Sequence, residues 1–428
     1  MIIKEKWRVD SSLSNTEFSS LLNEALALKF FEKQKILTII PDGTRSGPTG
    51  LLFRTILDSL YGRASKIDFM IALGTHPAIG ENQLEKLLGI SCADLQSKYP
   101  ETAVYQHCWD DSYIITEIGT ITSKEIYEIT KGLLDEDIPV TVNRNILDYD
   151  QIILAGPVFP HEVVGFSGGY KYIFPGVSGP HFLHKFHWLG ALITNPKING
   201  TKDTPVRDAI NKAVSFIKTP ITQICYVVKD KNVYGLYVGD NQAWSQAADL
   251  SAQLNIKYVK NSYKTVLSMA PLMYDDIWTA GKCMYKLEPV VADGGTLIIY
   301  APHITEVSYT HGKYIEQVGY HTRDYFVKQW EKFKDFPGGI LAHSTHVKGI
   351  GTFINGKENP RISVCLATGI TKQMCEKINL GYINPGAIDI NEFIRKPDTL
   401  VVRDAGEVLF RLENGDVPDI DELYRIHK

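Results

Sequence analysis

The sequence predicts an α/β protein made of two α/β domains with mainly parallel sheets. The chain has 428 residues, more than one ordinary hydrophobic core serves, so two domains are expected. Short apolar runs rich in Ile, Val and Leu alternate with segments whose apolar residues have helical spacing. This alternation is typical of βαβ units, and apolar runs of this length favour buried parallel strands.

The first series of apolar runs predicts an N-terminal domain over residues 1–262. Its expected strands are "KILTIIP" (35–41), "IDFMIAL" (67–73), "TAVYQH" (102–107) and "DQIILAG" (150–156). Helices are expected at 47–62, 80–89 and 204–217, the last with Thr204 as N-cap and Pro205 at its first position. Two strands joined by a turn at "KDKN" follow. This domain therefore alternates strands and helices along most of its length.

A second series of apolar runs predicts a C-terminal domain over residues 263–398. The runs are "YKTVLSMA" (263–270), "TLIIYAP" (296–302) and "ISVCLATG" (362–369). Residues 399–412 have the pattern of a β-hairpin, and 399–428 is expected to return to the first domain.

Composition excludes several classes of protein. The net charge of −4 gives no broad basic face, so a nucleic-acid partner is not expected. The six cysteines include no CxxC pair, which favours reduced thiols. The N-terminal residues have no apolar core of signal-peptide length, and no apolar run of the sequence is long enough to span a membrane. We expect a cytoplasmic protein with no membrane partner, and no oligomeric state is predicted.

Polar and titratable residues follow four successive predicted strands. Asp42, Thr44 and Arg45 follow the first, His76 the second, His107 with Asp110 and Asp111 the third, and His161 with Lys171 the fourth. Ligand sites in open α/β sheets lie outside the carboxyl ends of the strands, so these residues predict a site at that edge. His107 and His161 together are candidates for two general bases, although a lone histidine is more often structural than catalytic.

The stretch "GFSGGYKYIFPGVSGPHFLHKFHW" (165–188) combines a glycine turn, Lys171 and three histidines. It has neither the GxxxxGK[ST] pattern of a P-loop nor the GxGxxG dinucleotide fingerprint. Glycines at such a turn allow the backbone to approach a ligand closely. No zinc, HExxH or EF-hand motif is present. His181 and His184 have no predicted role.

The run from His161 through "GFSGG" and Lys171 to His187 resembles the nickel-pincer nucleotide enzymes of the lactate racemase family. The "DGTR" turn, the "GTHP" turn and His107 followed by "DD" agree with that pattern. The resemblance is strong to about residue 215 and weaker beyond it.

The resemblance implies a pyridinium-3,5-bisthiocarboxylic acid mononucleotide that holds one nickel ion. Lys171 matches the lysine that carries this cofactor covalently, and His187 matches the histidine ligand of the metal. A square-planar nickel site with one imidazole is consistent with the preferences of Ni(II). Asp42, Thr44, Gly168 and Gly169 are expected to contact the cofactor.

The resemblance also implies the chemistry, which is racemisation or C2 epimerisation of a 2-hydroxy acid by proton-coupled hydride transfer. His107 and His161 match the family's two bases, one for each hydroxyl position. Arg45 matches a ligand for the substrate carboxylate, for which a guanidinium is well suited. Lys282, in the second domain, matches a family lysine that faces the substrate. The site is therefore expected in the cleft between the two domains.

Departures from the family pattern bear on the substrate. Trp278 and Thr279 stand where lactate racemase has Tyr-Gln, and "LAHSTHVKGIGTF" (341–353) brings His343, Thr345, His346 and Lys348 in place of an aromatic-containing segment. Such donors and acceptors favour a larger polyhydroxy acid of the gluconate type. These residues are equally consistent with positions outside the substrate pocket.

Three alternative functions remain open from the sequence alone. The chain could be a racemase of lactate or of another short-chain 2-hydroxy acid, or a non-catalytic protein that binds nickel or the pincer nucleotide. A nicotinamide dehydrogenase is disfavoured because GxGxxG is missing. The expected partners are a small 2-hydroxy acid and, transiently, the enzymes that synthesise the cofactor.

Overall fold

The computed structural model describes residues 1–426, which form two compact units. Unit 1 comprises Met1–Phe159, Phe166–Leu183 and Lys202–Leu254, and unit 2 comprises Pro160–Gly165, His184–Thr201 and the chain from Asn255 onward. No helix formed by residues 1–426 is long and apolar enough to cross a membrane.

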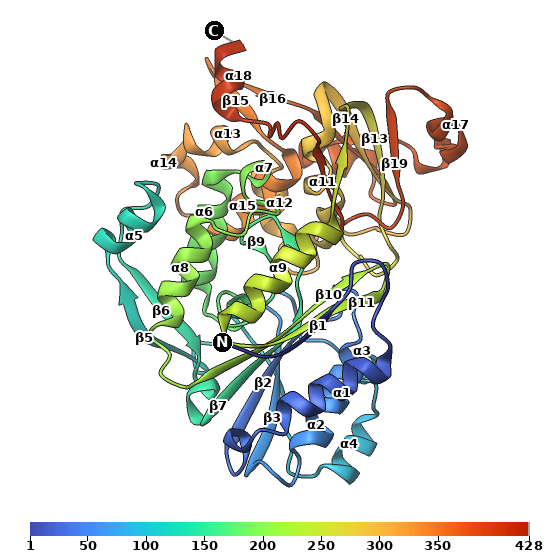
Figure 1. The fold of residues 1–428 in the computed structure, drawn as a ribbon. Coiled ribbons are helices and arrows are strands. Elements are labelled where there is room, and N and C mark those ends of the chain that lie inside the picture. The colour runs from blue at the N-terminus through green and yellow to red at the C-terminus, as the bar shows by residue number, and fades with distance from the viewer. Residues whose placement is uncertain (427–428) are drawn as a thin grey trace. The chain divides into compact units, whose positions relative to one another are not determined.

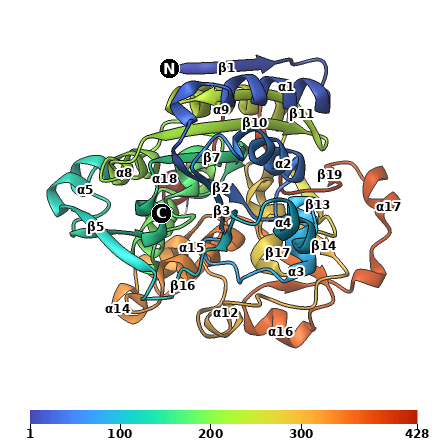
Figure 2. The same cartoon turned by 90° about the horizontal axis from the view of Figure 1, so that it is seen from below.

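Unit 1 is built on a seven-stranded sheet (Figure 1). In spatial order its strands are β1 (Ile2–Trp7), β11 (Asn232–Gly239), β10 (Ile221–Lys229), β7 (Gln151–Pro157), β2 (Lys35–Pro41), β3 (Lys66–Ala72) and β4 (Val104–Gln106). The five strands from β10 to β4 are parallel, while β11 is antiparallel to both of its neighbours. Figure 2 shows β1 at one edge of this sheet beside β11. The parallel strands direct their carboxyl ends to one edge, where the predicted site residues of this unit begin.

Helices cover this sheet because the strands are apolar on both faces. The helices of unit 1 are α1 (Asn15–Leu26), α2 (Thr49–Leu60), α3 (Glu81–Leu88), α4 (Cys92–Lys98), α5 (Ser123–Thr130), α8 (Pro205–Val214) and α9 (Asn241–Asn255). Ile36 and Ile40 of β2 pack in one buried cluster with Phe53 and Ile56 of α2. A separate antiparallel pair, β5 (Ile115–Ile121) and β6 (Ile138–Asn143), completes the unit.

Unit 2 contains a five-stranded sheet in which every pair of neighbours is parallel. The order is β18 (Gly381–Tyr382), β17 (Ser363–Thr368), β14 (Val291–Ala301), β13 (Tyr263–Met269) and β19 (Thr399–Val402). Figure 1 shows β13, β14 and β19 side by side. Shorter pairs are β12 (Ile256–Val259) with β20 (Leu409–Leu412), β15 (Gly351–Ile354) with β16 (Lys357–Pro360), and β8 (Pro160–His161) with β9 (Gly165–Phe166).

The helices of unit 2 pack around a large apolar core. They are α7 (Asn195–Ile198), α10 (Ile277–Ala280), α11 (Lys282–Tyr285), α12 (Gly312–Val318), α13 (Arg323–Val327), α14 (Trp330–Phe333), α15 (Gly338–Lys348), α16 (Lys372–Lys377), α17 (Ile390–Arg395) and α18 (Ile420–Ile426). Trp188 of α6 (Pro180–Ile193) joins Leu297 of β14 and Leu341 of α15 in this core. Helix α6 therefore contributes residues to both units, since its first turn belongs to unit 1.

The predicted architecture of two α/β bodies with mainly parallel sheets is confirmed. Each predicted strand of the first series is present, and β2 has the predicted bounds of Lys35–Pro41. Thr204 caps α8 as expected, since its side chain accepts a hydrogen bond from the Arg207 backbone N–H.

The predicted hairpin at 399–412 is wrong, and the compact units differ from the predicted domain bounds. β19 pairs with β13, and β20 pairs with β12, so the two strands extend different sheets of unit 2. The local pattern of two apolar runs around a turn fits a hairpin, but tertiary pairing overrides it. Residues 399–426 accordingly lie in unit 2, as do 160–165, 184–201 and 255–262.

Candidate functional site

Asp42 organises the turn that follows β2 in unit 1. Its Oδ1 accepts hydrogen bonds from the Thr44 backbone N–H at 3.1 Å and from Thr44 Oγ1 at 2.7 Å. Its Oδ2 lies 2.5 Å from Nδ1 of His76, which belongs to the turn after β3. Asp42 is buried, whereas Thr44, Arg45 and His76 are half-buried. The pair thus joins two neighbouring strand-end turns, and it assigns to His76 a structural partner that the sequence alone did not indicate.

Residues at the ends of three strands of unit 1 form hydrogen bonds to the segment that contains Lys171. Three hydrogen bonds run from Gly74 N to Gly176 O (3.0 Å), from Asn143 N to Val177 O (2.9 Å) and from His107 Nε2 to Ser178 O (3.1 Å). The backbone N–H of Gly176 in turn donates to the Lys171 carbonyl at 3.0 Å. Residues from the ends of β3, β4 and β6 therefore fix the position of the Lys171 turn.

Gly168 and Gly169 have backbone conformations that side chains rarely adopt, with φ of +78° and +60°. A Cβ on Gly168 would lie 2.8 Å from Val158 Cγ2, and one on Gly169 would lie 2.7 Å from Gln223 Oε1 and 2.8 Å from the Trp244 ring. Neighbouring protein atoms therefore occupy the space that a side chain at either position would need. Both positions are required by the turn itself, independently of any cofactor.

Arg207 lies beneath this glycine turn and was not among the predicted site residues. It is 2% exposed, its guanidinium carbon lies 4.0 Å from the centroid of the Trp244 ring, and it donates a hydrogen bond to the Phe166 carbonyl. The Trp244 indole N–H donates to the Ser167 carbonyl at 2.9 Å. Burial lowers the pKa of Arg207 to about 9. The available signal was an arginine at helical spacing from apolar Ile210 and Val214, on the buried face of α8.

His107 is held in the buried part of unit 1 and is 2% exposed. Burial lowers its pKa to about 4, against the opposing effects of the hydrogen bond to the Ser178 carbonyl and of the negative charge on Asp110. The imidazole is therefore neutral near pH 7, which is the form that a general base requires.

His161, the other predicted base, lies in unit 2 and is 5% exposed. Its Nδ1 accepts a hydrogen bond from the Val163 backbone N–H at 3.2 Å and lies 3.2 Å from Glu162 Oε2. A carboxylate at this distance stabilises a protonated imidazole. Glu162 is thus suited to stabilise the protonated imidazole of His161, which forms when this base accepts a proton.

The three histidines of α6 differ in their surroundings. His181 is exposed, and His187 is half-buried. His184 accepts a hydrogen bond at Nδ1 from the Gly339 backbone N–H at 3.3 Å, in the first turn of α15. Since the first N–H groups of a helix have no partner within it, His184 acts as a cap for α15. Of the two histidines left without a role by the sequence, one is therefore structural.

Helix α15 carries His343 and His346 into a cluster of aromatic rings in unit 2. The His343 ring stacks on Trp278 with a centroid distance of 4.0 Å, and its Nε2 lies 3.3 Å from the Tyr320 hydroxyl. Burial lowers the pKa of His343 well below its usual value, and the nearby imidazoles of His346, His311 and His187 act in the same direction. The pKa of His346 is lowered to about 4, chiefly by burial. His343 and His346 are therefore uncharged near neutral pH.

The other predicted substrate contacts of unit 2 have mixed environments. Lys282 is 6% exposed, with Nζ 4.7 Å from the centroid of the Tyr274 ring. The backbone N–H of Thr279 donates to Asp276 at 2.8 Å. Thr345 and Lys348 use their polar atoms on backbone carbonyls, those of Ala342 at 2.9 Å and Asn379 at 2.6 Å. His346 Nε2, by contrast, has no hydrogen-bond partner among residues 1–426.

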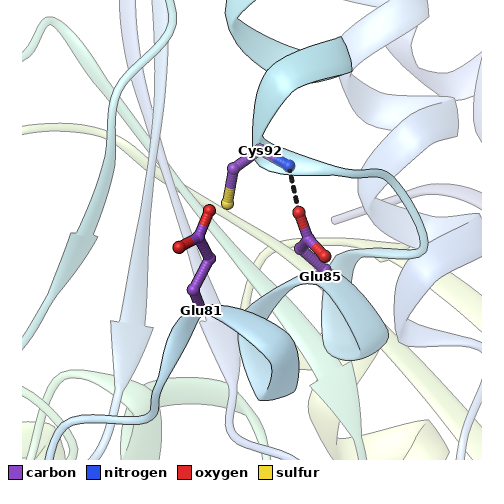
Figure 3. A group of neighbouring side chains, drawn as sticks. All are labelled: Glu81, Glu85 and Cys92. Carbon is purple, nitrogen blue, oxygen red and sulfur yellow. Dashed lines mark hydrogen bonds between the residues drawn. The ribbon is translucent and has the colours of Figure 1, made fainter.

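One group of three potential metal ligands occurs among residues 1–426, and it includes no histidine. Figure 3 shows Glu81 and Glu85 on α3 beside Cys92, with ligand atoms within 4.8 Å of one another. The Cys92 backbone N–H donates to Glu85 Oε1 at 2.8 Å. Burial raises the pKa of the Cys92 thiol, and both carboxylates raise it further, so the thiolate that a metal needs is disfavoured. The group is accounted for as a partly exposed acidic pair beside a neutral thiol.

Comparison with known proteins gives the family. Residues 4–199 match the family model described as the lactate racemase N-terminal domain. A lactate racemase from Thermoanaerobacterium thermosaccharolyticum is 23% identical over 278 residues, which cover 63% of this chain and 60% of that protein. A lactate racemase from Lactiplantibacillus plantarum is 24% identical over 309 residues, which cover 70% of this chain and 66% of that protein. Both alignments span less than two thirds of the relative's own length.

Solved structures show the same fold. A crystal structure of a protein from Thermotoga maritima is 32% identical, has a TM-score of 0.87, and the match covers 95% of this chain and all of that one. The lactate racemase apoprotein from T. thermosaccharolyticum is 18% identical and shares the fold, with a TM-score of 0.68 and coverage of 91% and 88%. These matches define an α/β protein with the two mainly parallel sheets of that apoprotein. Residues 4–199 therefore form an N-terminal domain of the lactate racemase family.

Proposed function

We propose that this protein is a racemase or C2 epimerase of a 2-hydroxy acid and that it uses a nickel-pincer nucleotide bound covalently to Lys171. The observation that carries the proposal is the set of hydrogen bonds that hold the Lys171 segment in unit 1. Hydrogen bonds join the Lys171 segment to the turn after β3 and to His107, while Asp42 joins the turn of Arg45 to His76. A lysine, a neutral base and an arginine therefore belong to one hydrogen-bonded group of turns.

The residues present fit the proposed cofactor. Lys171 is half-buried on a turn that the neighbouring loops hold in place, as a covalent anchor requires. His187 is half-buried, and the nearby imidazoles of His343 and His346 have lowered pKa values, so neither imidazole places a positive charge beside the metal ligand. Imidazole is a suitable ligand for Ni(II). When bound, the nucleotide supplies an acceptor and donor of hydride.

The residues of the chain supply the acid–base and binding steps. His107 is neutral near pH 7, so it is able to accept the proton of the substrate hydroxyl. His161 would serve the opposite configuration, and the adjacent Glu162 carboxylate stabilises its protonated form. Arg45 binds the substrate carboxylate through paired hydrogen bonds. Lys282 adds a second positive charge for the anionic substrate.

We infer that the substrate is a polyhydroxy acid of the gluconate type. Helices α10 and α15 of unit 2 carry the Thr279 hydroxyl and the imidazoles of His343 and His346, and His346 Nε2 is buried with no hydrogen-bond partner among residues 1–426. A buried polar atom of this kind favours a ligand with hydroxyl groups, because an apolar methyl group would leave it unsatisfied. Lys348 and Thr345 do not contribute to this argument, since their polar atoms bind backbone carbonyls.

The decisive experiment is intact-mass measurement of protein produced together with the cofactor-synthesis enzymes. We expect an adduct with the mass of the mononucleotide, and we expect Lys171→Ala to lose it. Lys124→Ala, at an exposed lysine of unit 1, is the matched control and should keep the adduct. An adduct that survives Lys171→Ala would overturn the proposed anchor.

A panel assay of the holoenzyme tests the reaction and the substrate. Lactate, malate and gluconate would be incubated in deuterium oxide, and the configuration at C2 would be followed by NMR. Inversion at C2 with little deuterium incorporation is expected, and extensive incorporation would point to simple deprotonation instead. Activity on lactate alone would support a short-chain racemase. Cofactor binding without turnover of any acid would support a binding protein.

A further inference from the structure

Asn143 holds one ring nitrogen of His107. It is the last residue of β6, is 2% exposed and lies wholly within unit 1. Its side-chain Nδ2 is 3.3 Å from His107 Nδ1, and its Oδ1 accepts a hydrogen bond from the Asn145 backbone N–H at 3.1 Å. The side chain thus makes a contact at each end of its amide.

These two contacts determine which end of the amide faces the imidazole. A backbone N–H only donates, so the end of the amide beside Asn145 must be the carbonyl oxygen. The amide NH₂ group therefore faces His107 Nδ1, and an NH₂ group only donates. Consequently Nδ1 must present its lone pair and carry no proton.

The other ring nitrogen is restrained in the same sense. His107 Nε2 lies 3.1 Å from the carbonyl oxygen of Ser178, which only accepts. Nε2 must therefore carry the proton. The opposite tautomer would set two donors against each other at Nδ1 and two lone pairs against each other at Nε2, so both hydrogen bonds would be lost.

We propose that Asn143 is a positioning residue that holds His107 in the Nε2–H tautomer, with Nδ1 as the atom that accepts the substrate proton. This inference rests on the proposed function only where it concerns the substrate. Asn143 does not itself touch the reacting atoms, and it acts through His107. The long Asn143–His107 contact of 3.3 Å is the weaker of the two restraints on the ring. A substrate hydroxyl can therefore replace the amide at Nδ1 while Ser178 continues to hold Nε2.

The titration of His107 is consistent with this arrangement. Burial is the main cause of its low pKa of about 4, and the Ser178 carbonyl and Asp110 oppose it. The Asn143 NH₂ group can donate only to an unprotonated Nδ1, so its contact with the ring is compatible with the neutral imidazole alone. Asn143 therefore keeps the base free of its proton before the substrate arrives.

The tautomer is measured directly in the wild-type protein by NMR of selectively ¹⁵N-labelled histidine. The spectrum of a His107→Gln variant identifies the two ring-nitrogen signals of His107. We expect a protonated Nε2 and an unprotonated Nδ1 throughout the range from pH 5 to 8. A protonated Nδ1 in the wild-type protein would overturn the inference, and this result needs no variant at Asn143 and no activity.

The variant Asn143→Asp tests the role of the donor. One carboxylate oxygen can still accept from Asn145 N–H, but the other oxygen now requires a proton on Nδ1. With Ser178 also requiring a proton on Nε2, the pKa of His107 should rise by roughly 2 pH units from its value of about 4. Asn145→Asp is the matched control, because it adds the same charge two residues away without contacting the ring.

Activity provides the readout that a purely structural residue would not alter. The acid limb of kcat/KM for the holoenzyme should move upward by roughly 2 pH units in Asn143→Asp and stay in place in Asn145→Asp. Equal shifts in both variants, or none, would overturn the inference. If the tautomer is as expected but no acid is racemised, the proposed function fails while the role of Asn143 at His107 stands.

Discussion

Replacing Gly169 with alanine should destabilise unit 1 even in the absence of any cofactor. The residue has φ of +60°, where an L side chain costs about 1–2 kcal/mol. The new Cβ would also lie 2.7 Å from Gln223 Oε1 and 2.8 Å from the Trp244 ring. Because Trp244 is anchored to the Ser167 carbonyl and packs on Arg207, it cannot move away freely, and overpacking of this kind costs about 1–3 kcal/mol.

The two effects together predict a loss of about 2–5 kcal/mol in the free energy of unfolding, a large share of a typical 5–15 kcal/mol. Urea unfolding of the apoprotein, followed by circular dichroism, measures this loss. Gly43→Ala is the matched control, since Gly43 is exposed and nothing lies within 4 Å of the position that a Cβ would take there. That variant should remain within about 0.5 kcal/mol of wild type. Equal stability of the two variants would refute the reasoning and would leave cofactor approach as the reason for Gly169.

Two further predictions concern unit 2. His184→Ala removes the acceptor for the Gly339 N–H and should lower the free energy of unfolding by about 1 kcal/mol, whereas His181→Ala, at an exposed position of α6, should change it little. His346 has a folded-state pKa of about 4, below the usual unfolded value of about 6.5, so the unfolded chain binds more protons between these limits. Above about pH 6.5 the imidazole is neutral in both the folded and the unfolded chain, so the fold has its full stability. The free energy of unfolding then falls by about 3 kcal/mol as the pH falls to 4. His346→Gln should therefore show a shallower loss of stability in urea unfolding between pH 7 and pH 4.5, and an unchanged slope would contradict the assignment.

Most of the regular structure could be predicted from the sequence because its causes are local. Apolar runs such as 35–41 form β2 over the same residues, and the cap at Thr204 begins α8 where expected. The prediction of a hairpin at 399–412 was wrong because the pairing of its strands is not decided locally. Its two strands find partners more than a hundred residues away, in β13 and β12, and no local pattern reports such pairings.

The candidate site shows the same division between features with local causes and features that depend on distant residues. The residue types that bear chemistry, such as Lys171, His107 and His161, stand out in the sequence because they follow glycine turns and strand ends. Their partners do not stand out. Asn143, which contacts His107 across 36 positions, is an ordinary polar residue at the end of a strand until the fold brings it there. Arg207 resembled one more charged residue of an amphipathic helix.

The sequence alone therefore determined the fold class, the family resemblance and the residues able to carry the chemistry, since each depends on composition and short-range pattern. Only the tertiary structure decided the state of those residues. Burial makes His107 neutral, and Asn143 and Ser178 restrain its tautomer. The fold also gives His184 a capping role and fills the open face of Gly169 with Trp244. Protonation, tautomer and packing depend on atoms distant in the chain, and those distances exist only once the chain has folded.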